Sequence, residues 1–193
     1  MNTETEITEA TQYFTFTLGE EDFALEIGKV REVLDYTTIT KVPRMPQFLR
    51  GVINLRGNVV PVIDLRLKLG MSAIKKTIDT CIVIVETPIE GELTHMGALA
   101  DSVKEVIDLD PSQIAPPPKL GIRLNSDFIK GMGKQDEKFL IILDIDRLLS
   151  SDELDIVRTA SEESDPPLQE IALDAVPTSD MRSMEAEVAA PTT

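Results

Sequence analysis

Alternating apolar and polar positions up to about residue 150 predict β-strands joined by tight turns. The stretch "YFTFTLG" (13–19) alternates aromatic residues with threonine, and "EEDFALEI" (20–27) follows it as the second arm of a hairpin. "CIVIVE" (81–86) is a short apolar run, which is typical of a strand covered on both faces. Helical character is limited to short segments such as "GKVREVL", "DLRLKLG" and "DIDRLLS". The pattern therefore predicts a mainly β protein with helical turns at the joints.

One predicted hairpin, "GVINLRGNVVPVIDL" (51–65), holds a charged residue at its tip. Arg56 lies between two apolar runs, and Gly57 can supply the positive φ that a tight turn requires. Such an arginine is either simply solvated, or presented as a guanidinium whose several donors suit a partner's carboxylate or carbonyl groups. Glu32 stands among apolar residues in "VREVL", which indicates either the wall of a groove or ordinary alternation.

An internal repeat organises the chain. "FLRGVINLRGNVVPVIDLRLKL", which begins at Phe48, aligns with "FIKGMGKQDEKFLIILDIDRLL" 80 positions later, and "VREVLD" (30–35) aligns with "VKEVID" (103–108). Two units of 70–80 residues are too few and too long for a solenoid, and they predict two small β-barrels that pack on one another. The second copy spans roughly residues 80–150. Arg56 aligns with Asp136, so the apolar frame is duplicated and the arginine is not.

Composition and charge narrow the compartment and the partners. The 193 residues carry a net charge of −15, of which −9 lies from Ser151 onward. Phosphate backbones and anionic lipid would repel such a chain, so we expect neither nucleic acid nor a membrane surface as a partner. The single cysteine, Cys81, permits no internal disulfide, and neither a signal peptide nor a membrane-length apolar run is present. These features predict a cytoplasmic protein without direct membrane insertion.

The two ends of the chain differ from its middle. Residues 1–10 are polar and acidic, and we expect them to be disordered. The stretch "SSDELDIVRTASEE" (150–163) has a serine at a plausible N-cap and acids in its first turn, which predicts a closing helix that ends within residues 155–164. Residues 165–193 combine proline, serine, threonine and acids with few large apolar groups, and predict a disordered acidic tail.

Candidate chemistry is sparse. The only histidine, His95, lies in a loop-like stretch, and without further His or Cys no zinc set can form. "GMGK" (131–134) lacks the spacing and the following Ser or Thr of a phosphate loop. Asp64 and Asp144 occupy equivalent positions after apolar strands, which favours turn capping over a catalytic carboxylate pair. The sequence predicts no catalytic residue, metal site or cofactor.

In these motifs the chain resembles the CheW family, the coupling proteins of bacterial chemotaxis. The strongest element is "NLRG" followed by "VVPVIDLR", and the landmarks occur in order from about residue 11 to residue 154. The resemblance implies a CheW-like domain over residues 11–154, built from two intertwined SH3-like five-stranded barrels. It also implies a non-catalytic scaffold that couples the cytoplasmic tips of methyl-accepting chemoreceptors to the regulatory domain of the histidine kinase CheA.

The resemblance also implies two groups of binding residues. In the family, a receptor's helical hairpin lies against the groove between the barrels, and the matching positions are Val30, Glu32, Val33 and Arg56. The kinase contact involves the first barrel, where the candidates are Lys41, Val42, Phe48, Arg50 and Gly57.

Two alternatives remain open at this stage. The chain is equally compatible with a coupling protein of a non-flagellar chemosensory pathway, because the partner and not the adaptor's fold sets the output. In a different class, a β-barrel that binds a small ligand would require a defined apolar pocket.

Overall fold

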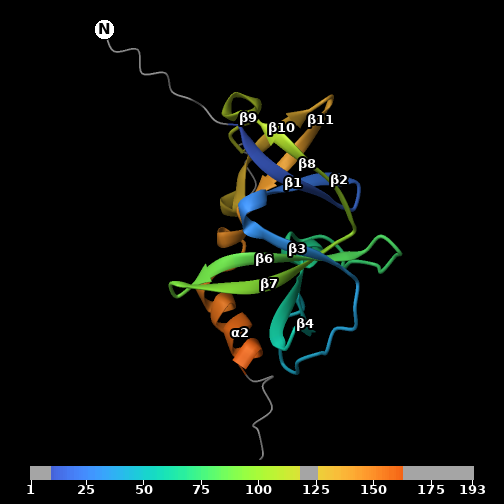
Figure 1. The fold of residues 1–193 in the computed structure, drawn as a ribbon, viewed down its shortest axis with the longest axis vertical. Coiled ribbons are helices and arrows are strands. Elements are labelled where there is room, and N and C mark those ends of the chain that lie inside the picture. Colours follow the sequence, from blue (N-terminus) through green and yellow to red (C-terminus); the bar gives the residue numbers. More distant parts are fainter. Residues whose placement is uncertain (1–9, 118–125, 163–193) are drawn as a thin grey trace, which may run out of the picture.

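The computed structural model describes residues 10–117 and 126–162, which form two β-sheets with short helical segments (Figure 1). The strands are β1 (Thr11–Leu18), β2 (Glu21–Glu26), β3 (Val30–Asp35), β4 (Leu49–Leu55), β5 (Asn58–Asp64), β6 (Cys81–Ile89), β7 (Glu92–Ala100), β8 (Ser102–Leu109), β9 (Ile114–Ala115), β10 (Ile129–Gln135) and β11 (Lys138–Leu143). The helices are α1 (Leu65–Lys68) and α2 (Ser151–Glu162), with 3₁₀ turns at Ile27–Lys29, Pro111–Gln113, Ser126–Phe128 and Ile145–Arg147. The predicted mainly β fold is confirmed. The structure does not describe residues 1–9 and 165–193, for which the sequence predicts disorder. It also does not describe residues 163 and 164, where the predicted helix could end.

The two sheets exchange hairpins between the repeats. The six-stranded sheet has the order β8-β1-β2-β11-β10-β9, and the five-stranded sheet has the order β3-β6-β7-β5-β4. The β1–β2 hairpin is thus inserted between strands of the second repeat, and the β6–β7 hairpin between strands of the first. Parallel pairing of β2 with β11 and of β5 with β7 joins each hairpin to its host sheet. Neither sheet is complete without the other repeat.

The duplicated frame predicted from the sequence is present in the structure. The β4–β5 and β10–β11 hairpins each have a register shift, next to Gly51 and Gly131 respectively. At the strand ends the backbone N–H groups of Asp64 and Asp144 each donate to the carbonyl 16 residues earlier, both at 2.7 Å. The two tips are also alike, because Arg56 and Asp136 both have a φ of 53°.

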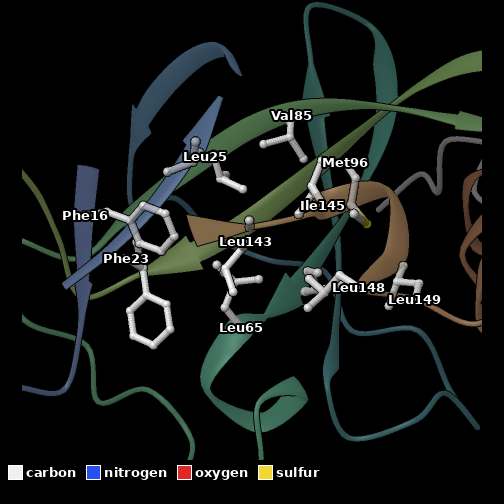
Figure 2. Close-up of a cluster of buried hydrophobic side chains, with 14 of the residues drawn as sticks. Phe16, Phe23, Leu25, Leu65, Val85, Met96, Leu143, Ile145, Leu148 and Leu149 are labelled. Atoms are coloured by element: carbon white, nitrogen blue, oxygen red, sulfur yellow. The ribbon is translucent and has the colours of Figure 1, made fainter. Parts of the chain in front are cut away.

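The core has three parts, one shared and one within each sheet. Figure 2 shows the shared part, where side chains from β1, β2 and β11 meet side chains from β6 and β7: Phe16, Phe23, Leu25, Leu143, Val85 and Met96 among them. A second cluster belongs to the five-stranded sheet alone: Ile53, Val60, Val62, Ile82, Ile84 and Leu99. A third belongs to the six-stranded sheet: Tyr13, Ala24, Leu109, Leu140 and Ile142. Because successive side chains of a strand point to opposite faces, β6 contributes to two clusters at once, as its apolar run predicted.

The helical predictions are confirmed in part. "DLRLKLG" and "DIDRLLS" do form α1 and a 3₁₀ turn, and the capping role of the two aspartates is confirmed, since Asp64 accepts from the N–H groups of Arg66 and Leu67 and Asp144 from that of Asp146. The helix expected in "GKVREVL" is wrong beyond a 3₁₀ turn, because residues 30–35 are β3. Pairing of β3 with β6 outweighs its local helical pattern.

Candidate functional site

The candidate site is centred on the tip of the β4–β5 hairpin. Its loop consists of Arg56 and Gly57 alone, with φ values of 53° and 90°. Positive φ at both loop positions is the signature of a type I′ turn, whose twist matches that of the flanking strands. The Asn54 Oδ1 accepts from the Gly57 N–H at 2.8 Å and braces the turn. The tip is therefore a rigid two-residue loop that projects an arginine.

Arg56 and Glu32, two of the four predicted receptor-binding residues, form a bidentate ion pair. Arg56 Nη1 donates to Glu32 Oε1 at 3.0 Å, and Nη2 donates to Oε2 at 2.9 Å. The Arg56 side chain remains 76% exposed, whereas Glu32 is 26% exposed. The carboxylate thus orients the guanidinium from the protein side and leaves most of it facing solvent.

The pair also reports the shape of the five-stranded sheet. In the strand order, Glu32 on β3 is separated from β5 by two intervening strands, which in a flat sheet amounts to about 14 Å. A hydrogen-bonded contact between β3 and the β4–β5 tip means that the sheet is strongly curled. The five-stranded sheet also has a core cluster of its own, and both features agree with the predicted barrel.

The second repeat builds a related contact without the cation. There Glu105, the equivalent of Glu32, accepts from Gln135 Nε2 at 3.1 Å, beside the tip residue Asp136. The frame thus positions a polar pair in both sheets, but only the first carries a full charge pair with an exposed guanidinium. Since packing requires the frame alone, the arginine needs another explanation.

The other two receptor-binding candidates lie on β3 but do not join the ion pair. Val30 is half-buried and packs against the shared core. Val33 is 41% exposed, and strand alternation places it on the face of β3 opposite to Glu32. Among the described strands β3 pairs with β6 alone, so it forms one edge of the sheet.

The five predicted kinase-binding residues are not gathered in one place. Lys41 is exposed and Val42 half-buried in the connection between β3 and β4. Phe48 packs against the shared core with Lys68 Nζ 4.9 Å from its ring centre, and Arg50 Nη1 lies 3.9 Å from Asp64 Oδ2. Phe48 and Arg50 lie near the start of β4, whose seven residues make it about 20 Å long.

The remaining kinase candidate, Gly57, lies at the opposite end of β4 from Phe48 and Arg50. It therefore sits beside Arg56 and away from the other four candidates.

Sequence reasoning missed a second charged cluster on the same sheet. Arg31 Nε donates to Glu86 Oε2 at 2.7 Å, a second guanidinium nitrogen donates to Oε1, and His95 Nε2 lies 3.4 Å from Oε2. The hydrogen bonds from Arg31 lower the pKa of Glu86, with the nearby His95 adding to the effect. The pairing of β6 with β7 places Glu86 opposite His95, a register that no local pattern in the sequence reveals.

Reactive chemistry is limited in the described part of the chain. Burial, with smaller contributions from Asp35 and Asp101, raises the pKa of Cys81 to about 11. Within residues 10–117 and 126–162, no three His, Cys, Asp or Glu side chains gather as a metal site would require. No helix in those ranges is long and apolar enough to cross a membrane.

Comparison with known proteins agrees with this geometry. The CheW-like domain family matches residues 12–153. A chemotaxis protein CheW from Klebsiella aerogenes is 35% identical over 146 residues, which are 76% of this chain and 86% of that protein. A second, from Helicobacter pylori, is 33% identical over 144 residues, covering 75% and 84%.

A solved structure agrees as well. The scaffolding protein TtCheW from Thermoanaerobacter tengcongensis aligns with a TM-score of 0.66 at 37% identity, over 75% of this chain and 95% of that one. The family match therefore covers nearly all the residues that form the two sheets. By sequence and by structure, the chain belongs to the CheW family of chemotaxis coupling scaffolds.

Proposed function

We propose that this chain couples the cytoplasmic tip of a chemoreceptor to the regulatory domain of the histidine kinase CheA, and that Arg56 is the central receptor contact. Glu32 orients it, and Val30 and Val33 provide apolar surface along β3. On the basis of its family we place the protein in the cytoplasm, recruited to receptor arrays, and assign it no catalysis of its own. Whether the output is flagellar or another chemosensory response depends on the partner.

The observation that carries the proposal is the unused bonding capacity of Arg56. A guanidinium has five N–H donors, and Glu32 takes two of them. No other partner of Arg56 occurs among the described residues, so three donors face solvent on a side chain that is 76% exposed. A rigid turn and a bidentate pair reduce the rotamer freedom that binding would otherwise remove. This arrangement suits a helical partner that offers carboxylate or carbonyl acceptors.

The expected contribution to affinity is moderate. An exposed ion pair adds only about 0–1 kcal/mol, but a hydrogen bond to a charged group that the partner shields from water adds about 1.5–3 kcal/mol. The upper range corresponds to roughly ten- to hundred-fold in the dissociation constant. Modest single contacts suit an array in which many simultaneous contacts provide stability.

For the kinase we propose a surface centred on Lys41 and Val42. Phe48 and Arg50 support it from the start of β4, where Phe48 packs on the core and Arg50 faces Asp64. Gly57 stays a candidate, and its position beside Arg56 would bring the kinase close to the receptor contact.

The small-ligand alternative is less well supported. A hollow of about 450 Å³ lies between β2, β8 and the β10–β11 hairpin. Its lining is rich in charged side chains: Asp22, Lys104, Glu105, Asp136, Glu137 and Lys138. A site for a small apolar ligand would be enclosed and mostly hydrophobic.

Arg56→Glu tests the proposal. We expect it to weaken binding to a receptor signalling fragment by at least about ten-fold, because the donors are lost and Glu32 then faces a like charge. Binding to the kinase should stay nearly unchanged. Titration calorimetry with each partner separately measures both. Arg147→Glu is the matched control, since Arg147 is 71% exposed and also pairs with one carboxylate.

A charge swap separates contact from support. In Glu32→Arg with Arg56→Glu the intramolecular pair is restored with reversed polarity. If Arg56 donates to the receptor, the swap does not recover binding. Full recovery, or an equal loss with Arg147→Glu, would refute the assignment of Arg56 as the receptor contact.

A further inference from the structure

Positive charge is concentrated in one segment of this acidic protein. Residues 36–78 contain eight Lys or Arg side chains and a single acid, Asp64, so the segment carries +7 in a chain whose net charge is −15. This segment comprises β4, β5, α1 and the connections before and after them. Such a charge contrast within one molecule creates a strong local field.

Half of these cations are already neutralised. Four of them form ion pairs: Arg50 with Asp64, Arg56 with Glu32, Arg66 with Asp101, and Lys68 with Glu153. Their charge is satisfied within the fold. Each of these cations therefore adds little net charge to the segment, although Arg56 keeps N–H donors for hydrogen bonds to a partner.

The other four cations, Lys41, Arg44, Lys75 and Lys76, are exposed and have no acidic partner among the described residues. Lys76 Nζ lies 4.4 Å from the ring centre of Tyr36, which opens the connection that bears Lys41 and Arg44. Tyr36 also packs on the same small core cluster as Ile74, next to Lys75. The two connections are therefore neighbours, and we call these four residues the basic patch.

The acidic end of the chain begins at the same end of the molecule as the connection that bears Lys41 and Arg44. α2 packs against β4 and β5, and its Glu153 is bonded to Lys68. Figure 1 shows α2 ending at the same end of the molecule as the connection between β3 and β4. Beyond α2, residues 163–193 hold seven Asp or Glu and one Arg, a net charge of −6.

We propose that residues 163–193 fold back over the basic patch and neutralise it. A chain of 31 residues has a root-mean-square reach of about 30 Å, which spans the patch from the end of α2. Single exposed ion pairs contribute only about 0–1 kcal/mol each. The tether, however, supplies an effective concentration on the order of millimolar, so several weak pairs hold the segment in place.

The occupant follows from charge and proximity. A partner's acidic surface must reach the patch by diffusion, whereas residues 163–193 are covalently attached to the end of α2. Their attraction is purely electrostatic, so it weakens as salt shortens the screening length from about 20 Å at 20 mM to about 4 Å at 500 mM.

Paramagnetic relaxation in the full chain tests the proposal. A nitroxide is attached to Ser179→Cys, which is selective because Cys81 is buried and its pKa is raised to about 11. At 20 mM salt we expect the backbone amide signals of the basic patch to broaden, and at 500 mM salt to recover. The amides of Lys134 and Lys138, exposed lysines of the other sheet, should stay sharp at both. Equal broadening of both groups, broadening that survives high salt, or none, would overturn the proposal.

Matched charge reversals provide the control. Lys41→Glu with Arg44→Glu should abolish the broadening at Lys75 and Lys76, and Lys134→Glu with Lys138→Glu, an equal change in net charge, should leave it intact. The same amide spectra report whether each variant is folded. Equal effects of the two pairs would count against the basic patch.

The experiment contains neither receptor nor kinase, so its failure leaves the proposed function untouched.

Discussion

Asp64 provides the sharpest test of how the duplicated frame is held together. Its side chain is fully buried, and it accepts from three backbone N–H groups: Arg66 at 3.0 Å, Leu67 at 3.3 Å and Ile74 at 3.1 Å. The carboxylate thus closes the first turn of α1 and also ties down the segment that follows it. Asp64→Ala removes both carboxylate oxygens and leaves all three N–H donors without their acceptor.

The magnitude follows from the donors left behind. A buried donor without a partner costs about 1–3 kcal/mol. Arg66 and Ile74 are only half-buried, so water satisfies part of the loss. We therefore expect Asp64→Ala to lower the free energy of unfolding by about 3 kcal/mol. In a chain of this size that corresponds to a fall of about 6–12 °C in Tm.

The second repeat supplies an internal control. Asp144 occupies the equivalent position, but it is 29% exposed and accepts from one backbone N–H, that of Asp146 at 3.1 Å. Asp144→Ala should cost about 1 kcal/mol, an ordinary loss of a cap. Urea unfolding followed by circular dichroism measures both variants. An equal loss, or a larger one for Asp144→Ala, would refute the argument that burial and bond number set the difference.

Three further predictions concern single positions. Gly51→Ala should destabilise the fold severely, since the φ of Gly51 is 137° and a Cβ there would lie 2.0 Å from a backbone oxygen. At Gly57 a Cβ would meet no atom within 4 Å, so Gly57→Ala should lower the stability far less. Thermal unfolding of the two variants compares these losses. Cys81 should resist alkylation at pH 8 in the folded protein, because burial raises its pKa to about 11; rapid labelling without denaturant would contradict this. Arg31→Gln should raise the pKa of Glu86 toward 4.5, because Arg31 stabilises the carboxylate. The native pair therefore stabilises the fold above about pH 4.5 and loses that effect as the pH falls. An unchanged NMR titration of Glu86 in the variant would show that Arg31 has no such role.

Local features of the fold follow from the sequence because they depend on neighbouring residues. The two-residue turn at Arg56 and Gly57, the capping by Asp64 and Asp144, and the helix that begins at Ser151 each rest on interactions within a few positions. The repeat extended this reach, since two copies of one pattern must form two copies of one frame. Arg56 also emerged from the repeat, as a charged residue that the frame does not require.

The tertiary structure alone decided what the two copies do with each other. Nothing in the residues of β1 and β2 specifies that this hairpin completes the sheet of the second repeat, because both sheets offer similar strand edges and only the packed core selects between them. The same holds for the bond between Glu32 and Arg56, and for the place of Gly57 at the far end of β4 from Phe48. Alternation along a strand determines which face a side chain takes, whereas the curl of the sheet and its partner strands determine which distant side chain it meets.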